Sequence, residues 1–155
     1  APTVPIDNLE QGRSTLFGEE DTEIIVTITD NPDYANFYVF DFGFGNFQTV
    51  DDQFFQGQQF GFSYFYDDKL QAGNDINVSI LGATEDFYNY MDLLVEQTQN
   101  NGGVFETPVA TVRGNVFDIT GLDNIDIFDN VERPNDYALG YFAVAQEFSS
   151  SLTIE

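Results

Sequence analysis

Four aspartates lie within twelve residues of one another in the second half of the chain, with Asn124 between them and Asn130 directly after the last. They are Asp118, Asp123, Asp126 and Asp129. They belong to a polar, acidic stretch that we expect to form a loop over residues 118–136. Ca²⁺ takes about 6–8 oxygen ligands on an adaptable loop, so these carboxylates are candidate calcium ligands. Their spacing does not match an EF-hand, and a solvated loop without metal is the alternative. We therefore expect no required cofactor, with calcium as the one candidate.

Aromatic residues in loops form a second group with possible function. Phe44, Phe47, Phe54 and Phe55 lie in a glycine-punctuated stretch, 43–57, that we expect to be a loop with at most one short strand. These rings cannot all be buried inside one small domain, and exposed aromatic patches commonly mark interfaces. We predict that the four residues form an interaction surface. The alternative is that they cover one end of the domain and a helix contact.

The composition removes most catalytic constellations. The 155 residues include no His and no Cys, which excludes Ser-His-Asp triads, Cys-His pairs, disulfides and zinc sites built from His or Cys. Two carboxylates can suffice for a glycosidase, but among 27 acidic residues such a pair arises by chance. We therefore expect a protein that is not an enzyme.

The net charge of -23 comes from 27 acidic and four basic residues. Phosphate contacts need Lys and Arg, so we expect no binding to nucleic acid and none to an anionic membrane surface. Cations, neutral sugars and basic protein partners remain compatible with this charge. No stretch approaches the roughly 20 apolar residues of a membrane-spanning helix, so we expect no transmembrane segment.

Alternating apolar residues predict most of the chain to be β-strand. The strands are expected at residues 23–29, 35–42, 58–66, 76–81, 109–117 and 137–148, with a short one at 152–154. We expect the first two strands to form an antiparallel pair, because only the short turn 30–33 separates them.

The stretch 84–100 predicts the single helix of the chain. Thr84 is a plausible N-cap, and apolar residues then recur at three- and four-residue spacing. They are Phe87, Tyr90, Met91, Leu94 and Val95. A helix of this length is unstable alone in water, so its apolar face must pack against a sheet.

Six to eight strands with one inserted helix predict an antiparallel β-sandwich of the immunoglobulin or fibronectin kind. A small closed β-barrel is the alternative. Residues 1–20 predict an extended arm or an edge strand. Residues 21–155 predict a single sandwich domain that includes the helix 84–100 and the acidic loop 118–136.

Several motifs follow one another in a specific order. They are DDQFFQGQQF at 51–60, the helical FYNYMDLLVEQ at 87–97, FETPV at 105–109, GN at 114–115 and ALGYF at 138–142. Their order and spacing resemble a family of Bacteroidota lipoproteins that carries a domain-of-unknown-function label. The resemblance covers roughly residues 24–145. In the family, the GN and LGYF motifs lie closer together in the sequence, whereas here residues 116–136 separate them. The resemblance therefore says nothing about the acidic loop.

The resemblance implies an exported protein at the outer membrane and cell surface of a Gram-negative bacterium. Family members usually begin with a lipidated cysteine and a further β-domain, so this chain resembles the C-terminal part of such a protein or a short relative, and we expect its lipid anchor not to be in these residues. Such proteins are often found beside TonB-dependent receptors. The resemblance therefore implies a non-enzymatic accessory or ligand-binding domain, with such a receptor or another surface protein as partner. A calcium-dependent adhesion or glycan-binding module is the alternative.

If the acidic loop binds calcium, the metal should stabilise the folded protein, because a ligand that binds only the native state raises the melting temperature. We expect calcium to raise the melting temperature of the wild type and to have no effect when Asp123 and Asp126 are both replaced by Asn. Magnesium serves as the control for ionic strength. An equal response of the two proteins to calcium would contradict the site.

Overall fold

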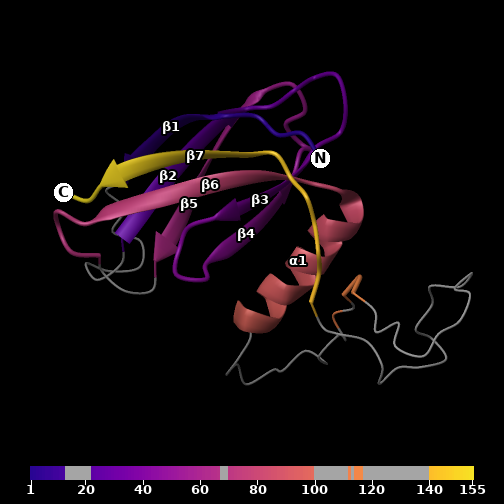
Figure 1. Cartoon of the computed structure of the whole chain (residues 1–155). Helices are drawn as coiled ribbons and strands as arrows, with labels where there is room; N and C mark the ends of the chain where they lie inside the picture. The colour runs from indigo at the N-terminus through magenta and orange to yellow at the C-terminus, as the bar shows by residue number, and fades with distance from the viewer. Residues whose placement is uncertain (13–21, 67–69, 100–111, 113, 117–139) are drawn as a thin grey trace, which may run out of the picture.

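The computed structural model describes residues 1–12, 22–66, 70–99, 112, 114–116 and 140–155. In this part of the chain, two antiparallel sheets and one helix form the fold (Figure 1). The three-stranded sheet has the order β1-β2-β5, formed by Ile6–Gln11, Thr22–Thr29 and Gln59–Tyr66. The four-stranded sheet has the order β4-β3-β6-β7, formed by Phe47–Asp51, Phe37–Asp41, Asp75–Ala83 and Glu147–Thr153. The helix α1 spans Glu85–Gln99.

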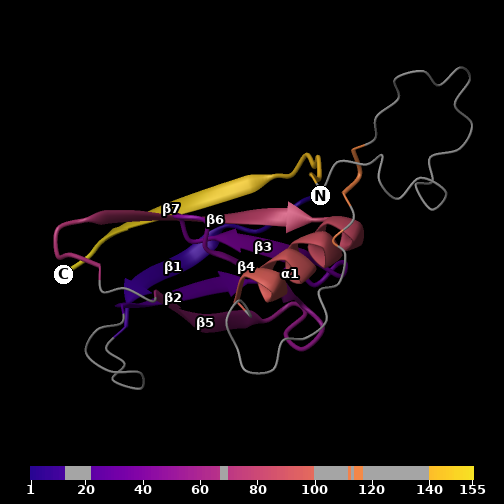
Figure 2. The ribbon, with the colours of Figure 1, turned by 90° about the horizontal axis from the view of Figure 1, so that it is seen from below.

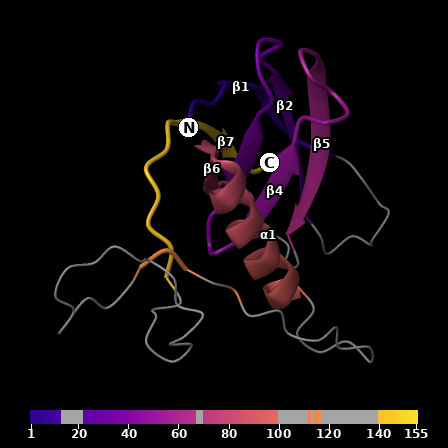
Figure 3. The same cartoon turned by 90° about the vertical axis from the view of Figure 1, so that its right-hand side faces the viewer.

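The two sheets pack face to face, and α1 covers the outer side of the four-stranded sheet (Figures 2 and 3). The helix contacts β4, β3 and β6. This architecture confirms the predicted mostly-β sandwich with one inserted helix, and the described strands do not close into a barrel.

Strand β3 has both of its faces covered, which makes it the centre of the fold. Tyr38 and Phe40 point into the core between the sheets, where the Phe40 ring lies 4.9 Å from that of Phe62 on β5. Phe37 and Val39 point the other way and pack against α1, with the Phe37 ring 5.1 Å from that of Tyr88. Successive strand residues point to opposite faces, so one aromatic strand serves two hydrophobic clusters.

The predicted pairing of the first two long strands is wrong. β2 pairs with β1 and β5, whereas β3 pairs with β4 and β6. The connection after β2 therefore carries the chain from one sheet to the other instead of closing a hairpin. The alternation in β2 marks a buried face, formed by Ile24, Val26 and Ile28, but it does not say which strand lies alongside.

The prediction of a strand over 137–148 is also wrong in its bounds. Among the described residues, 140–146 are not in a strand, and β7 begins at Glu147 and continues through 149–151, where the sequence analysis left a gap. The Tyr141 ring lies 5.4 Å from that of Phe87 and 4.9 Å from that of Tyr90. Contact with the helix therefore takes the place of pairing within the sheet. Of the predicted strand 109–117, residues 112 and 114–116 are described and are not in a strand.

The helix begins and packs as its sequence requires. The Thr84 hydroxyl oxygen accepts the Phe87 N–H at 3.3 Å, and Glu85 and Asp86 place negative charge at the positive end of the helix dipole. On the buried side, the Thr49 hydroxyl of β4 donates to the Asp92 carboxylate at 2.6 Å. This bond fixes the position of the helix on the sheet.

Candidate functional site

The structure separates the four phenylalanines that the sequence grouped as one interface. Phe44 lies in the turn between β3 and β4, and Phe54 lies in the turn between β4 and β5. Because β4 connects these two turns, they lie at opposite ends of the sandwich. Both rings point into solvent, with exposed fractions of 84% for Phe44 and 87% for Phe54.

The other two phenylalanines are not exposed, which corrects the expectation for them. Phe55 is buried in the core, where its ring stacks on that of Phe60 at 4.2 Å. Phe47 is partly buried in the cluster between the four-stranded sheet and α1. The tight turn after β4 sends two consecutive rings in opposite directions, a division that composition and spacing cannot reveal.

The Phe54 turn is attached to the domain through the buried carboxylate of Asp30. One oxygen of this carboxylate accepts the Tyr38 hydroxyl, and the other accepts the Gly57 N–H at 2.7 Å. The Asp30 N–H donates in turn to the Gln58 carbonyl at 3.0 Å. Gly57 has a φ of +69°, and a Cβ there would lie 2.8 Å from Pro32, so this position requires glycine.

A second buried carboxylate, that of Asp52, holds the start of the same turn. It accepts the Asn36 N–H at 2.6 Å, and the Asp52 N–H donates to the Asn36 carbonyl at 3.2 Å. Two buried aspartates therefore fasten the turn to the connection between β2 and β3. From the sequence, Asp30 was expected in the turn 30–33 and Asp52 in the loop 43–57, and neither was expected to be buried.

These buried acids have no basic residue near them in the part of the chain that the structure describes. The basic residues are Arg13, Lys69, Arg113 and Arg133, and all lie outside it. Burial raises the pKa of Asp52, and the nearby charge of Asp30 adds to this effect, while the hydrogen bond from the Asn36 N–H opposes it. Burial, followed by the hydrogen bond to Asp30, also raises the pKa of Tyr38.

The GN and ALGYF motifs meet in a second aromatic segment beside α1. The Asn115 side-chain amide donates to the Phe142 carbonyl at 2.7 Å, and its oxygen accepts the Phe142 N–H at 2.7 Å. Asn115 thus pairs with the backbone of Phe142 as a neighbouring strand would. The ring of Phe142 and the side chain of Val144 remain 71% and 80% exposed. The sequence analysis did not connect Asn115 with this segment, because 26 residues separate them.

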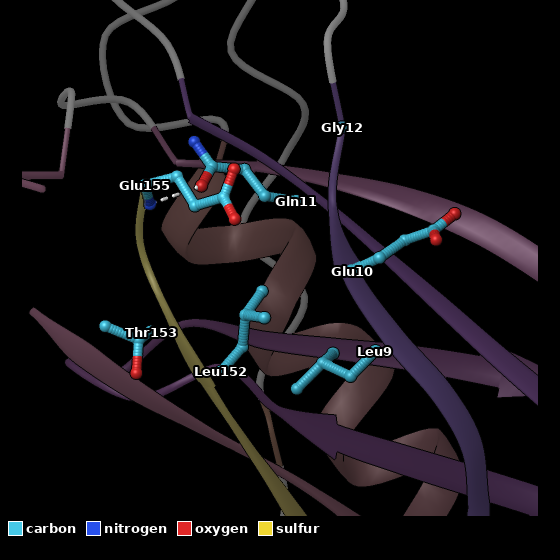
Figure 4. Close-up of a pocket in the computed structure, with 7 residues that line it drawn as sticks. All are labelled: Leu9, Glu10, Gln11, Gly12, Leu152, Thr153 and Glu155. Atoms are coloured by element: carbon cyan, nitrogen blue, oxygen red, sulfur yellow. Dashed lines mark hydrogen bonds between the residues drawn. The ribbon is translucent and has the colours of Figure 1, made fainter. Parts of the chain in front are cut away.

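A cavity of about 290 Å³ lies between the edges formed by β1 and β7 (Figure 4). Leu9 and Leu152 face each other across it, and the Gln11 side-chain oxygen accepts the Glu155 N–H at 2.8 Å. The Glu10 side chain points away from β7. Polar and apolar residues line this cavity in similar measure, and its volume lies just below the usual range for ligand pockets.

The predicted calcium ligands, Asp118, Asp123, Asp126 and Asp129, lie outside the described residues. Within the part of the chain that is described, no three acidic side chains come together as a metal site. In the same part, no helix has both the length and the apolar character needed to cross a membrane.

The model of a family described as a domain of unknown function, DUF4249, matches residues 1–151. The chain belongs to this family. The match confirms the expectation of a family that carries a domain-of-unknown-function label, and it covers more of the chain than the motifs, which spanned roughly residues 24–145. Neither a curated protein nor a solved structure matches the chain.

The buried Asp52 predicts a specific pH dependence. A carboxyl group whose pKa is raised by folding costs stability when it is ionised, and this cost disappears as the pH falls through the raised value towards the ordinary one near 4. We expect Asp52→Asn, which keeps an oxygen acceptor, to raise the melting temperature at pH 7 and to reduce the gain in stability as the pH falls from 7 to the ordinary value near 4.

Asp33→Asn is the matched control, because it removes one charge from an exposed position in the same region. It accounts for the general relief of repulsion when a protein of charge -23 is acidified. Identical pH profiles of the two variants would contradict the role assigned to Asp52.

Proposed function

We propose that this chain is a non-enzymatic accessory or ligand-binding domain of a bacterial surface lipoprotein that works with a TonB-dependent outer-membrane transporter. In this proposal, a lipid anchor holds the lipoprotein at the outer membrane of a Gram-negative bacterium. The order of the DDQFFQGQQF, GN and ALGYF motifs supports this proposal, because that order resembles the Bacteroidota lipoproteins described above.

The exposed ring of Phe54 is the observation that carries the docking role. It is 87% exposed, although the turn that bears it is fastened by hydrogen bonds to two buried aspartates. A rigid turn loses little conformational entropy when it binds, so a ring presented in this way favours tight association. Large aromatic side chains that enter a partner's pocket commonly supply much of the binding energy.

The charge of the domain favours a partner with basic residues around that pocket. Asp51 directly precedes the Phe54 turn, Asp33 lies in the β2–β3 connection to which that turn is fastened, and no described residue is Lys or Arg. Complementary charge accelerates the encounter of two proteins and selects among partners. An apolar pocket with a basic rim on the transporter or its cargo is therefore the surface that we propose for Phe54.

A calcium-dependent adhesion or glycan-binding module is the second candidate. It rests on the spacing of four aspartates within residues 118–129. In that case the acidic loop, rather than the Phe54 turn, would contact the ligand. Binding that survives complete removal of calcium would exclude this candidate.

The test is to isolate the full-length lipoprotein from its own bacterium in mild detergent, as the wild type and as Phe54→Ala. We expect a TonB-dependent transporter to accompany the wild type, and its amount to fall at least about tenfold with the variant. The free energy of unfolding should change by less than about 0.5 kcal/mol, because the ring makes no core contact.

Gln53→Ala is the control, since it alters the neighbouring exposed residue and should leave the complex intact. A wild-type lipoprotein that comes out of the membrane alone would contradict the proposed partner. An undiminished complex with Phe54→Ala would contradict the role of this turn while leaving the partner in place.

A further inference from the structure

The turn between β3 and β4 carries a residue in an unfavourable conformation. The Asn46 N–H donates to the Gly43 carbonyl at 2.9 Å, so Phe44 and Gly45 are the two central residues of the turn. Their φ angles are +56° and +84°. Positive φ at both central positions is the pattern of a type I′ hairpin turn, which favours Asn followed by Gly because these residues tolerate it.

A phenylalanine is a poor choice for the first of these positions. Positive φ is uncommon for residues other than glycine, and for a bulky side chain it is an outlier that costs free energy. The surrounding hydrogen bonds hold the turn in place, with the Asp41 carboxylate accepting the Gly43 N–H at 2.7 Å and the Phe42 N–H donating to the Asn46 carbonyl at 2.8 Å. The strain on Phe44 therefore persists in the folded domain.

The fold gains nothing from Phe44 to offset this strain. The ring is 84% exposed, so it is not buried against either sheet and contributes almost nothing to the core. Both the exposed apolar surface of the ring and the positive φ of its backbone are unfavourable for folding. Strained residues that the surrounding structure maintains commonly belong to binding sites, so a role in binding accounts for Phe44 where folding does not.

The composition of the turn indicates the shape of the surface that would receive the ring. Gly43 and Gly45 flank Phe44 and have no side chains, and residues 42–47 include no charged group. The ring therefore stands alone at the tip. We propose that Phe44 inserts into a narrow apolar pocket on a partner protein, at the end of the domain opposite Phe54. This contact is independent of the transporter proposed above.

The net charge of -23 favours a protein partner over the other possible occupants. An anionic bilayer repels such a domain, and so does a second copy of the same chain. A single ring also adds little to insertion in a bilayer, whereas one aromatic residue in a fitted pocket can dominate a protein interface. Basic residues around the pocket would complement the charge of the domain.

The first test separates the strain from the binding role. Phe44→Asn gives the turn the Asn-Gly sequence that its conformation prefers, and we expect the melting temperature to rise by about 2–4 °C. Phe44→Ala removes the ring but keeps a residue without Asn's tolerance of positive φ, so its gain should be smaller. An unchanged or lower melting temperature of Phe44→Asn would overturn the argument from strain.

The second test places the photo-crosslinker p-benzoylphenylalanine at position 44 or, as control, at the exposed Ala72, in the full-length protein inside its own bacterium. Ala72 lies in the β5–β6 connection at the same end of the sandwich. The proposal expects a crosslink from position 44 alone, confined to one apolar segment of one protein. That protein, once purified, should bind the wild type at least about tenfold more tightly than Phe44→Asn.

Three crosslinking results would overturn the proposal. The first is a crosslink to lipid, together with flotation on phosphatidylcholine vesicles that Phe44→Asn abolishes. The second is a crosslink to a second copy of the chain. The third is equal crosslinking from positions 44 and 72. Equal binding of the purified protein to the wild type and to Phe44→Asn would also overturn it. Loss of binding with Phe54→Ala has no bearing on this contact, because the two turns lie at opposite ends.

Discussion

The buried carboxylate of Asp30 is the constraint on which one end of the molecule depends. It follows β2 of the three-stranded sheet, accepts the hydroxyl of Tyr38 from the four-stranded sheet, and accepts the N–H of Gly57 just before β5. A buried carboxylate is costly unless hydrogen bonds satisfy it. The three segments must therefore come together wherever Asp30 is buried, and this fixes how the chain crosses between the sheets.

Local patterns in the sequence predicted the strands and the helix, whereas the long-range contacts of Asp30 could not be predicted. Alternation of apolar residues in β2 and β5 predicted the strands, and the spacing of Phe87, Met91 and Leu94 predicted the helix, because both patterns depend on local geometry. Strand pairing depends on long-range contacts. The turn at 30–33 suggested a hairpin, and nothing local showed that Asp30 would instead bind Tyr38 and Gly57.

The sequence predicted that some loop aromatic residues would be exposed, but not which ones or how they are arranged. An excess of loop aromatics correctly indicated exposed rings at Phe44 and Phe54, yet adjacent Phe55 is buried because a tight turn reverses the direction of successive side chains. Likewise, Asn115 and Phe142 were recognised as parts of separate motifs, and only the fold pairs the amide of one with the backbone of the other. The described strands thus form an acidic sandwich with a single exposed ring in a turn at each end.

Hydrogen exchange of the Gly57 amide measures whether the buried aspartates hold the Phe54 turn rigid. This N–H donates to Asp30 in a turn with no regular secondary structure. If Asp30 keeps the turn closed, the Gly57 amide exchanges as slowly as the N–H groups within β3, because both open only when the domain unfolds. Exchange as fast as that of an unbonded loop amide would show that the turn opens on its own and is not preorganised for docking.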